Sequence, residues 1–135
     1  MFLTYKPEGS DEPQRWRYDP RKLMSPEQEA LERYSGKDFS EFTQLVLKGN
    51  ARCRRALLWV FLKRDHPGIK FDDVNFAWDE LDLQYSKSEL AEMRDNALKS
   101  RPPSDAEAIR DHFDGEIATA YEDDEGKAAG LPVAG

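Results

Sequence analysis

Few residues of this 135-residue sequence have the type and spacing that catalysis or metal binding requires. The two histidines, His66 and His112, are far apart, and neither has the neighbouring ligands that a metal ion needs. The single cysteine, Cys53, excludes an internal disulfide and a cysteine-based zinc site. The carboxylate pairs lack EF-hand spacing, and there is no phosphate-binding glycine loop or nucleophile elbow. We therefore expect a protein that is not an enzyme and that uses no cofactor or metal.

Cys53 stands among three arginines, Arg52, Arg54 and Arg55. Basic neighbours lower the pKa of a thiol and make it more reactive, so a reactive cysteine is one interpretation. A small buried residue is the interpretation that we favour.

Charge argues against several classes of partner. The net charge of −7 opposes general binding to nucleic acid, because attraction to phosphate needs clustered positive charge. The distribution is uneven: residues 41–70 contain seven Lys/Arg and two Asp/Glu, whereas residues 71–125 contain five and seventeen. These parts could attract each other within one molecule or end to end between molecules, although solvated helix faces are the commoner explanation.

The sequence has no secretory signal and no apolar run near the ~20 residues of a membrane span. We expect a soluble, intracellular protein that binds neither nucleic acid nor membrane.

The element that must organise the fold is a helix over residues 51–65. Seven consecutive apolar residues, Ala56 to Leu62, make its middle apolar on all sides, which is typical of a helix buried on most sides. Pro67 cannot continue this helix. The predicted core residues in it are Leu57, Leu58, Trp59, Phe61 and Leu62.

The other elements follow from local signals. Residues 2–6 and 15–18 predict a short β-hairpin. A first helix is predicted with Ser25 as its N-cap, Pro26 at its first position, Gln28 completing a capping box, and Gly36 as its C-terminal stop. A second helix starts near Asp38, and further helices follow Ser86 or Ser88 and Ser104. Residues 78–85 fit a strand, with a helix as the alternative. The predicted fold is mainly α (small α+β), with the hairpin packed on about four to five helices. We divide it into a helical domain (1–100), a C-terminal helix (101–121) and a disordered acidic tail (122–135).

An acidic segment after Pro67 carries four apolar residues that are candidates for binding a partner: Phe71, Val74, Phe76 and Trp78. Exposed aromatic residues with a charged rim are typical anchors of protein interfaces. Packing in the core of the same chain is the alternative explanation.

An ordered series of short patterns then suggests a family. The series is Trp16–Pro20, Glu29–Arg33 with Gly36, Lys48–Asn50, Arg55–Arg64, Pro67, Phe71–Val74 and Phe76. Together these patterns resemble the tail assembly chaperones of long-tailed (siphovirus-type) phages and prophages of actinobacteria. The resemblance covers about residues 15 to 85 and contains no catalytic signature.

The resemblance implies a role in virion morphogenesis. Such a chaperone binds and solubilises the tape-measure protein and promotes polymerisation of the tail-tube protein around it. It works in the cytoplasm of the bacterial host and is absent from the mature virion. Many members also have a long form made by programmed frameshift, and codons for Glu125–Lys127 are compatible with a slippery sequence. The long form and further copies of the same chain are therefore expected partners.

The sequence also fits two other functions. A structural head–tail connector or tail completion protein would stay in the virion. A DNA-binding regulator would use Arg52, Arg54, Arg55, Lys63 and Arg64, although the apolar residues between them do not suit a helix that reads base edges.

Overall fold

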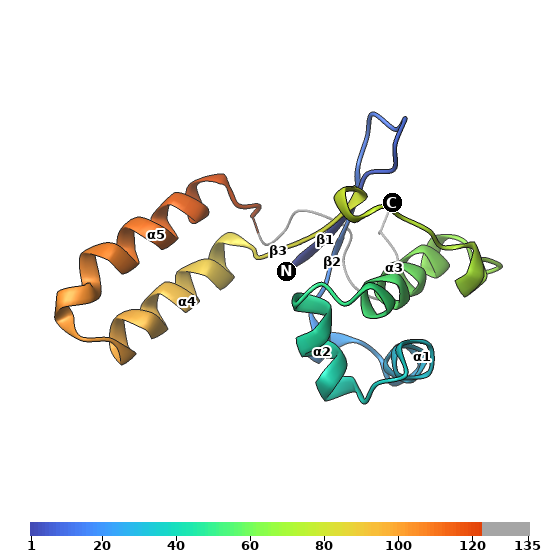
Figure 1. Cartoon of the computed structure of the whole chain (residues 1–135), viewed down its shortest axis with the longest axis horizontal. Helices are drawn as coiled ribbons and strands as arrows, with labels where there is room; N and C mark the ends of the chain where they lie inside the picture. Colours follow the sequence, from blue (N-terminus) through green and yellow to red (C-terminus); the bar gives the residue numbers. More distant parts are fainter. Residues whose placement is uncertain (123–135) are drawn as a thin grey trace.

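The computed structural model describes residues 1–122 and shows a mainly helical protein with one small sheet (Figure 1). The helices are α1 (Ser25–Ser35), α2 (Phe39–Leu47), α3 (Ala51–Asp65), α4 (Lys87–Ser100) and α5 (Ala106–Thr119). The strands are β1 (Phe2–Tyr5), β2 (Gln14–Arg17) and β3 (Leu81–Gln84). The predicted mainly α fold with a short hairpin is confirmed. The predicted tail, apart from Glu122, and the frameshift codons 125–127 lie outside the described residues.

The sheet has the order β2-β1-β3, with β1 antiparallel to both neighbours. Leu3 in β1 faces Trp16 of β2 on one side and Leu83 of β3 on the other. The predicted hairpin is thus present, and of the two alternatives for residues 78–85 the strand is correct. A single 3-10 turn, Trp78–Glu80, precedes it. The third strand gives the hairpin the extra pairing that an isolated pair of strands lacks in water.

The core surrounds α3, which has the predicted bounds. The Asn50 side chain caps its first turn by accepting a hydrogen bond from the Cys53 backbone N–H at 3.0 Å. Leu57, Leu58 and Phe61 are fully buried and Trp59 is 4% exposed, whereas Leu62 is half-buried at the edge of the core. The β2 strand closes the core from the other side, because the Trp16 ring stacks on Phe61 at 5.8 Å.

The ends of α1 show one prediction confirmed and one corrected. Gly36 adopts a left-handed φ of 72° and closes the helix by donating its backbone N–H to the Glu32 carbonyl. Ser25 is not the N-cap: it is the first residue of the helix, and Met24 occupies the cap position without a side-chain hydrogen bond. The helix can begin without that bond because Pro26 is preorganised for the first turn.

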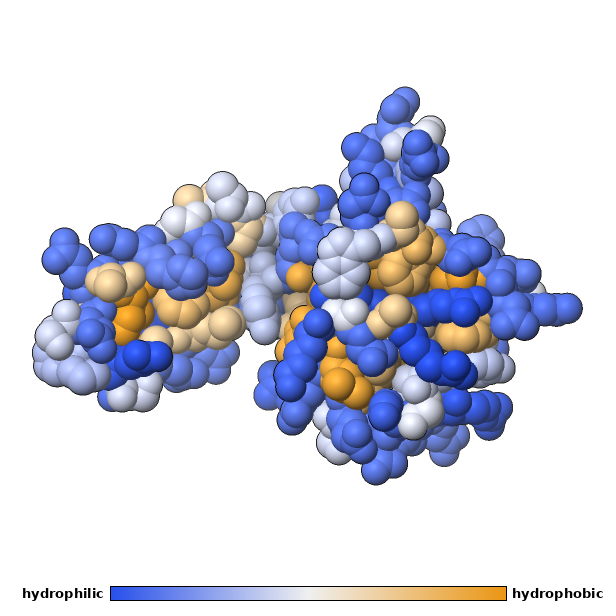
Figure 2. Space-filling model, viewed as in Figure 1, coloured by the Kyte–Doolittle hydropathy of each residue, from blue (hydrophilic) through white to orange (hydrophobic). Residues whose placement is uncertain are grey.

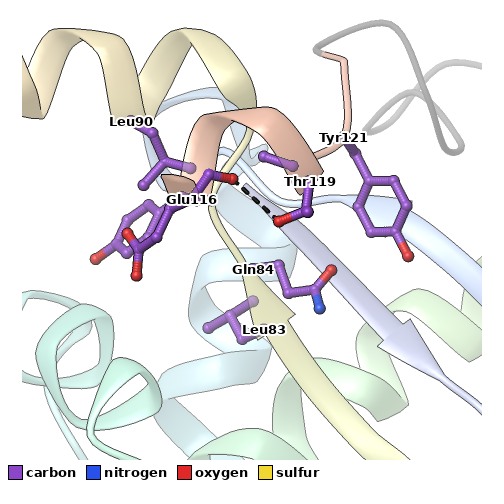
Figure 3. A pocket seen from close by; sticks show the side chains of 8 residues that line it. Leu83, Gln84, Leu90, Glu116, Thr119 and Tyr121 are labelled. Atoms are coloured by element: carbon purple, nitrogen blue, oxygen red, sulfur yellow. Dashed lines mark hydrogen bonds between the residues drawn. The ribbon is translucent and has the colours of Figure 1, made fainter. Parts of the chain in front are cut away.

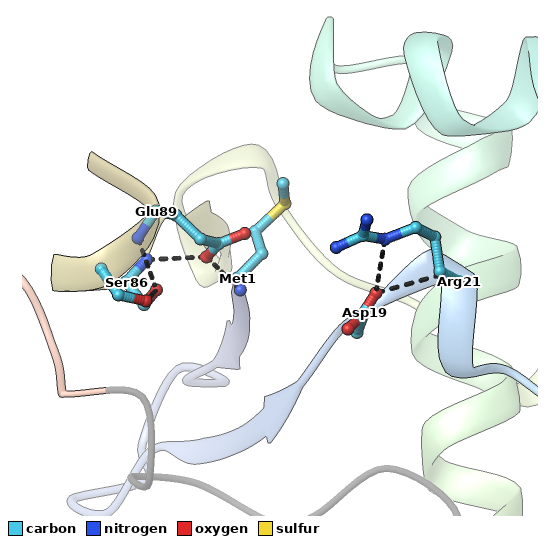
Figure 4. A network of polar contacts seen from close by, with 6 residues as sticks. Met1, Asp19, Arg21, Ser86 and Glu89 are labelled. Atoms are coloured by element: carbon cyan, nitrogen blue, oxygen red, sulfur yellow. Dashed lines mark hydrogen bonds and ion pairs between the residues drawn. The ribbon is translucent and has the colours of Figure 1, made fainter. Parts of the chain in front are cut away.

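Helices α4 and α5 form an antiparallel hairpin, here called the α4–α5 hairpin (residues 87–119), that extends away from the rest of the molecule (Figure 1). We call residues 1–86 the body. At the junction, Ser86 caps α4: its backbone N–H donates to the Glu89 carboxylate, and its hydroxyl accepts the Glu89 N–H (Figure 4). The Met1 amino group also contacts the Glu89 carboxylate. The predicted domain boundary at residue 100 falls between two helices that pack on each other.

Candidate partner-binding surface

The acidic segment after Pro67 is held against α3 by polar side chains of that helix. Arg55 donates from Nε to the Val74 carbonyl at 2.8 Å and from Nη2 to the Phe71 carbonyl at 3.2 Å. The Trp59 indole N–H donates to the Ile69 carbonyl at 3.1 Å. These bonds satisfy the backbone of an irregular segment and fix which of its side chains face inward.

The four candidate residues of this segment are not equivalent in the structure. Val74 is buried, with 2% of its surface exposed. Phe71 is half-buried, with its ring stacked on Tyr34 at 4.9 Å and 4.5 Å from the Arg55 guanidinium, and Phe76 is half-buried against the core. Trp78 alone among the four is largely exposed, at 69%. The structure therefore leaves Trp78 as the side chain that a partner could reach without rearrangement.

The Trp78 ring rests on a glycine. Gly49, between α2 and α3, has a left-handed φ of 91°, and a Cβ added there would lie 2.7 Å from the ring atom Cη2. The Arg54 guanidinium lies 5.2 Å from the ring centroid and is itself fixed, because its Nε donates to the buried Val46 carbonyl at 3.0 Å. A bare backbone and a cation thus support the exposed tryptophan.

The turn that carries Trp78 is fixed by Glu80. Its carboxylate accepts the backbone N–H groups of Ala77 and Glu8, each at 2.6 Å, and its own carbonyl accepts the Lys6 N–H at 2.8 Å. The two N–H groups lower the pKa of the Glu80 carboxyl below its ordinary value of 4.5. The turn is thereby tied to the loop between β1 and β2.

The arginines of α3 make contacts within the chain. Arg52 donates to the Tyr34 carbonyl at 2.6 Å, and Arg64 binds the Glu27 carboxylate with two hydrogen bonds, at 2.9 and 2.8 Å. Arg54 and Arg55 bind carbonyl groups as described above. These four arginines are therefore engaged by carbonyl and carboxylate groups of the same chain and contribute to its tertiary structure.

Cys53 is fully buried, and burial raises the pKa of its thiol. The nearby positive charges of the sequence do not overcome this loss of solvation. Of the two interpretations of Cys53, the small buried residue is the one that the structure supports.

Metal-binding clusters and surface depressions are the features of the described residues that bear on chemistry. Among residues 1–122 there is no cluster of three or more His, Cys, Asp or Glu side chains placed to hold a metal ion. A depression of about 290 Å³ lies between β3 and the end of α5, lined by Leu83, Gln84, Leu90, Glu116, Thr119 and Tyr121 (Figure 3). The residues that line it include no second carboxylate and no histidine, although His112 Nε2 lies 3.9 Å from Glu116 Oε2 on the same helix. Within residues 1–122, no helix combines the length and apolar character that crossing a membrane requires.

Comparisons of the chain with protein families, with curated proteins and with solved structures found no match. The resemblance to tail assembly chaperones therefore stays a prediction from the sequence patterns.

Two residues that support the Trp78 ring, Gly49 and Arg54, were not predicted from the sequence. Gly49 appeared there only within the Lys48–Asn50 pattern, and Arg54 only as a basic neighbour of Cys53 and a candidate DNA contact. Nothing in the sequence links either of them to a tryptophan more than twenty positions away.

Proposed function

We propose that this protein is a tail assembly chaperone of a long-tailed actinobacterial phage or prophage. In this role it is not an enzyme. It binds and solubilises the tape-measure protein, promotes polymerisation of the tail-tube protein, and leaves before the virion is complete. A frameshifted long form and further copies of the chain would assist it in the host cytoplasm. The support is the ordered resemblance over residues 15–85 together with one observation, the exposed and fixed Trp78.

The physical argument starts from the partner. A tape-measure protein exposes long apolar helical stripes before assembly, and such stripes aggregate. A protein that protects them needs apolar anchors on a charged surface, and tryptophan is among the residue types that contribute most to protein interfaces. Because Gly49 and Arg54 already hold the Trp78 ring, little side-chain entropy is lost when a partner covers it.

Co-expression with the tape-measure protein of the same genome tests the proposal. We expect the wild-type chain to make the tape measure soluble and to co-purify with it. Trp78→Ala should weaken binding by about 2 kcal/mol, or ~30-fold in Kd, as for other interface anchors. Met24→Ala is the matched control, because Met24 is 67% exposed, similar to Trp78, but lies before α1. An insoluble tape measure and no co-purification, with the long form also supplied, would refute the proposal.

Mass spectrometry of mature virions provides an independent test. A chaperone leaves the particle, so we expect no stoichiometric amount of this chain among the virion proteins. Its presence at the copy number of a connector or completion protein would overturn the chaperone proposal and favour the structural alternative.

A further inference from the structure

The α4–α5 hairpin leaves an apolar face without a partner. Leu90 is the only buried residue of α4, and α5 has none. The half-buried or exposed apolar side chains nevertheless recur at helical spacing on both helices. They are Met93, Ala97 and Leu98 on α4 and Ile109, Phe113 and Ile117 on α5. Figure 2 shows apolar side chains gathered along the viewed face of this hairpin, apart from those of the body.

Two helices alone cannot cover such a face. An apolar stripe on a helix is stable when another layer packs on it, and the described part of the body does not provide that layer, because α4 and α5 pack mainly on each other. A third helix would complete a small bundle. Each helix has 14 residues, so a partner helix of about 20 Å, or four turns, would match their length.

Charge indicates which helix fits. Residues 87–119 contain eight Asp/Glu and five Lys/Arg. Arg94 pairs with Asp114 at 2.9 Å, inside this range, and Lys87 pairs with Glu122 at 3.2 Å, outside it. Setting these pairs aside leaves seven Asp/Glu and three Lys/Arg, so the charge available to a partner is negative. A second hairpin of the same kind would bring like charges together, which opposes association, whereas a basic helix would be attracted.

We propose that the α4–α5 hairpin binds a lysine- or arginine-flanked amphipathic helix and forms a three-helix bundle with it. The identity of that helix as a segment of the tape-measure protein rests on the proposed function. The apolar face of the α4–α5 hairpin is separate from Trp78, which lies on the body. The chain would therefore bind one long helical partner at two places. Two such contacts on one partner raise the overall affinity through effective concentration.

A peptide titration of the full chain tests the hairpin directly. The probe is a fluorescent 18-residue helix with leucine at i, i+3, i+4 and i+7 positions and lysine elsewhere, and its counterpart carries glutamate in place of every lysine. Fluorescence anisotropy should show binding of the lysine peptide at least about 10-fold tighter than the glutamate peptide. Raising the salt concentration should weaken it.

Two variants with the same added charge locate the site. Met93→Lys places a cation within the apolar face and should weaken binding of the lysine peptide about 10-fold or more. Ala118→Lys adds the same charge at an exposed position of α5 outside the apolar stripe and should change binding less than about 3-fold. Should Met93→Lys lose helical circular dichroism, Met93→Gln replaces it in the comparison.

Three results would overturn the inference. They are no binding of the lysine peptide, equal weakening by the Met93 and Ala118 variants, or a dimer in sedimentation equilibrium that Met93→Lys abolishes, which would make a second copy the occupant.

Co-expression separates this inference from the proposed function. A tape measure solubilised equally by wild type and Met93→Lys refutes the hairpin site alone. Peptide binding at the hairpin without any effect on the tape measure refutes the proposed function alone.

Discussion

Replacing Gly49 with alanine tests how the exposed Trp78 ring is supported. Two costs are expected. Alanine at a φ of 91° is strained, which costs about 1–2 kcal/mol for an L residue in the left-handed region. The new Cβ would also lie 2.7 Å from Trp78 Cη2 and 3.1 Å from Cζ3, so the ring must move.

The second cost can be bounded from the exposure of the ring. Trp78 is 69% exposed, so it buries roughly 80 Å² of a surface of about 250 Å². At ~25 cal/mol per Å², complete loss of this packing costs about 2 kcal/mol, which is an upper limit because the ring can shift and keep part of its contacts. We therefore expect Gly49→Ala to destabilise the wild-type chain by about 1–4 kcal/mol.

A double-mutant cycle separates the two costs. In the Trp78→Ala background no ring opposes the new methyl group, so Gly49→Ala should cost only the backbone strain of about 1–2 kcal/mol. The free energy of unfolding is measured by urea titration with far-UV circular dichroism, because fluorescence would change with the loss of Trp78. Gly68→Ala is the control: Gly68 has no positive φ, and a Cβ there would meet nothing within 4 Å.

Either of two results would refute this reasoning. An equal cost of Gly49→Ala in both backgrounds would mean that the Trp78 ring does not rest on Gly49. A Gly49→Ala variant as harmless as Gly68→Ala would mean that neither the clash nor the strain is present. If the reasoning holds, Gly49→Ala should also weaken tape-measure binding, since it displaces the proposed anchor.

Three further predictions concern residues that stabilise the body of the protein. Arg55→Met should cost about 2–3 kcal/mol of unfolding free energy, because the carbonyls of Phe71 and Val74 lose a charged donor; unchanged hydrogen exchange of that segment would contradict this. Leu57→Ala should cost about 2–5 kcal/mol, as for other fully buried leucines, and a loss below 1 kcal/mol in urea titration would contradict its core position. Glu80 has a lowered pKa, so its stabilising contribution is present above pH 4.5 and is lost as the pH falls through its folded pKa. Glu80→Gln should therefore be less stable than wild type at neutral pH and should approach it in acid, and a difference independent of pH would contradict this.

Much of the helical architecture could be predicted because its signals are local. The bounds of α3 follow from an Asn50 cap, seven apolar residues and Pro67, all within one short stretch of sequence. Gly36 ends α1 for a similarly local reason, since glycine adopts the left-handed conformation of a helix C-terminus without a steric penalty. The start of α1 shows the limit of local signals. Ser25 has the side chain of an N-cap, yet the helix begins at Ser25 itself, with Met24 at the cap position and Pro26 in the first turn.

Pairing across long sequence separations could not be predicted. Residues 81–84 suit a strand by their alternation, but only the folded chain shows that they pair with residues 2–5 at the edge of the hairpin. The α4–α5 hairpin is a similar case. Each helix has a recognisable apolar stripe, yet the fact that the two helices pack mainly on each other and extend away from the body depends on the path of the chain after Ser86.

The order of residues is enough to place an acidic segment with four apolar residues after the central helix. Only packing in the folded chain shows that Val74 is buried, Phe71 and Phe76 are half-buried and Trp78 is exposed. The contacts responsible come from residues distant in the sequence. Arg55 donates hydrogen bonds to the carbonyls of Phe71 and Val74, and Gly49 provides the surface on which the Trp78 ring lies. Local sequence sets which conformations a segment can adopt, whereas burial of a side chain depends on which remote atoms fill the space around it.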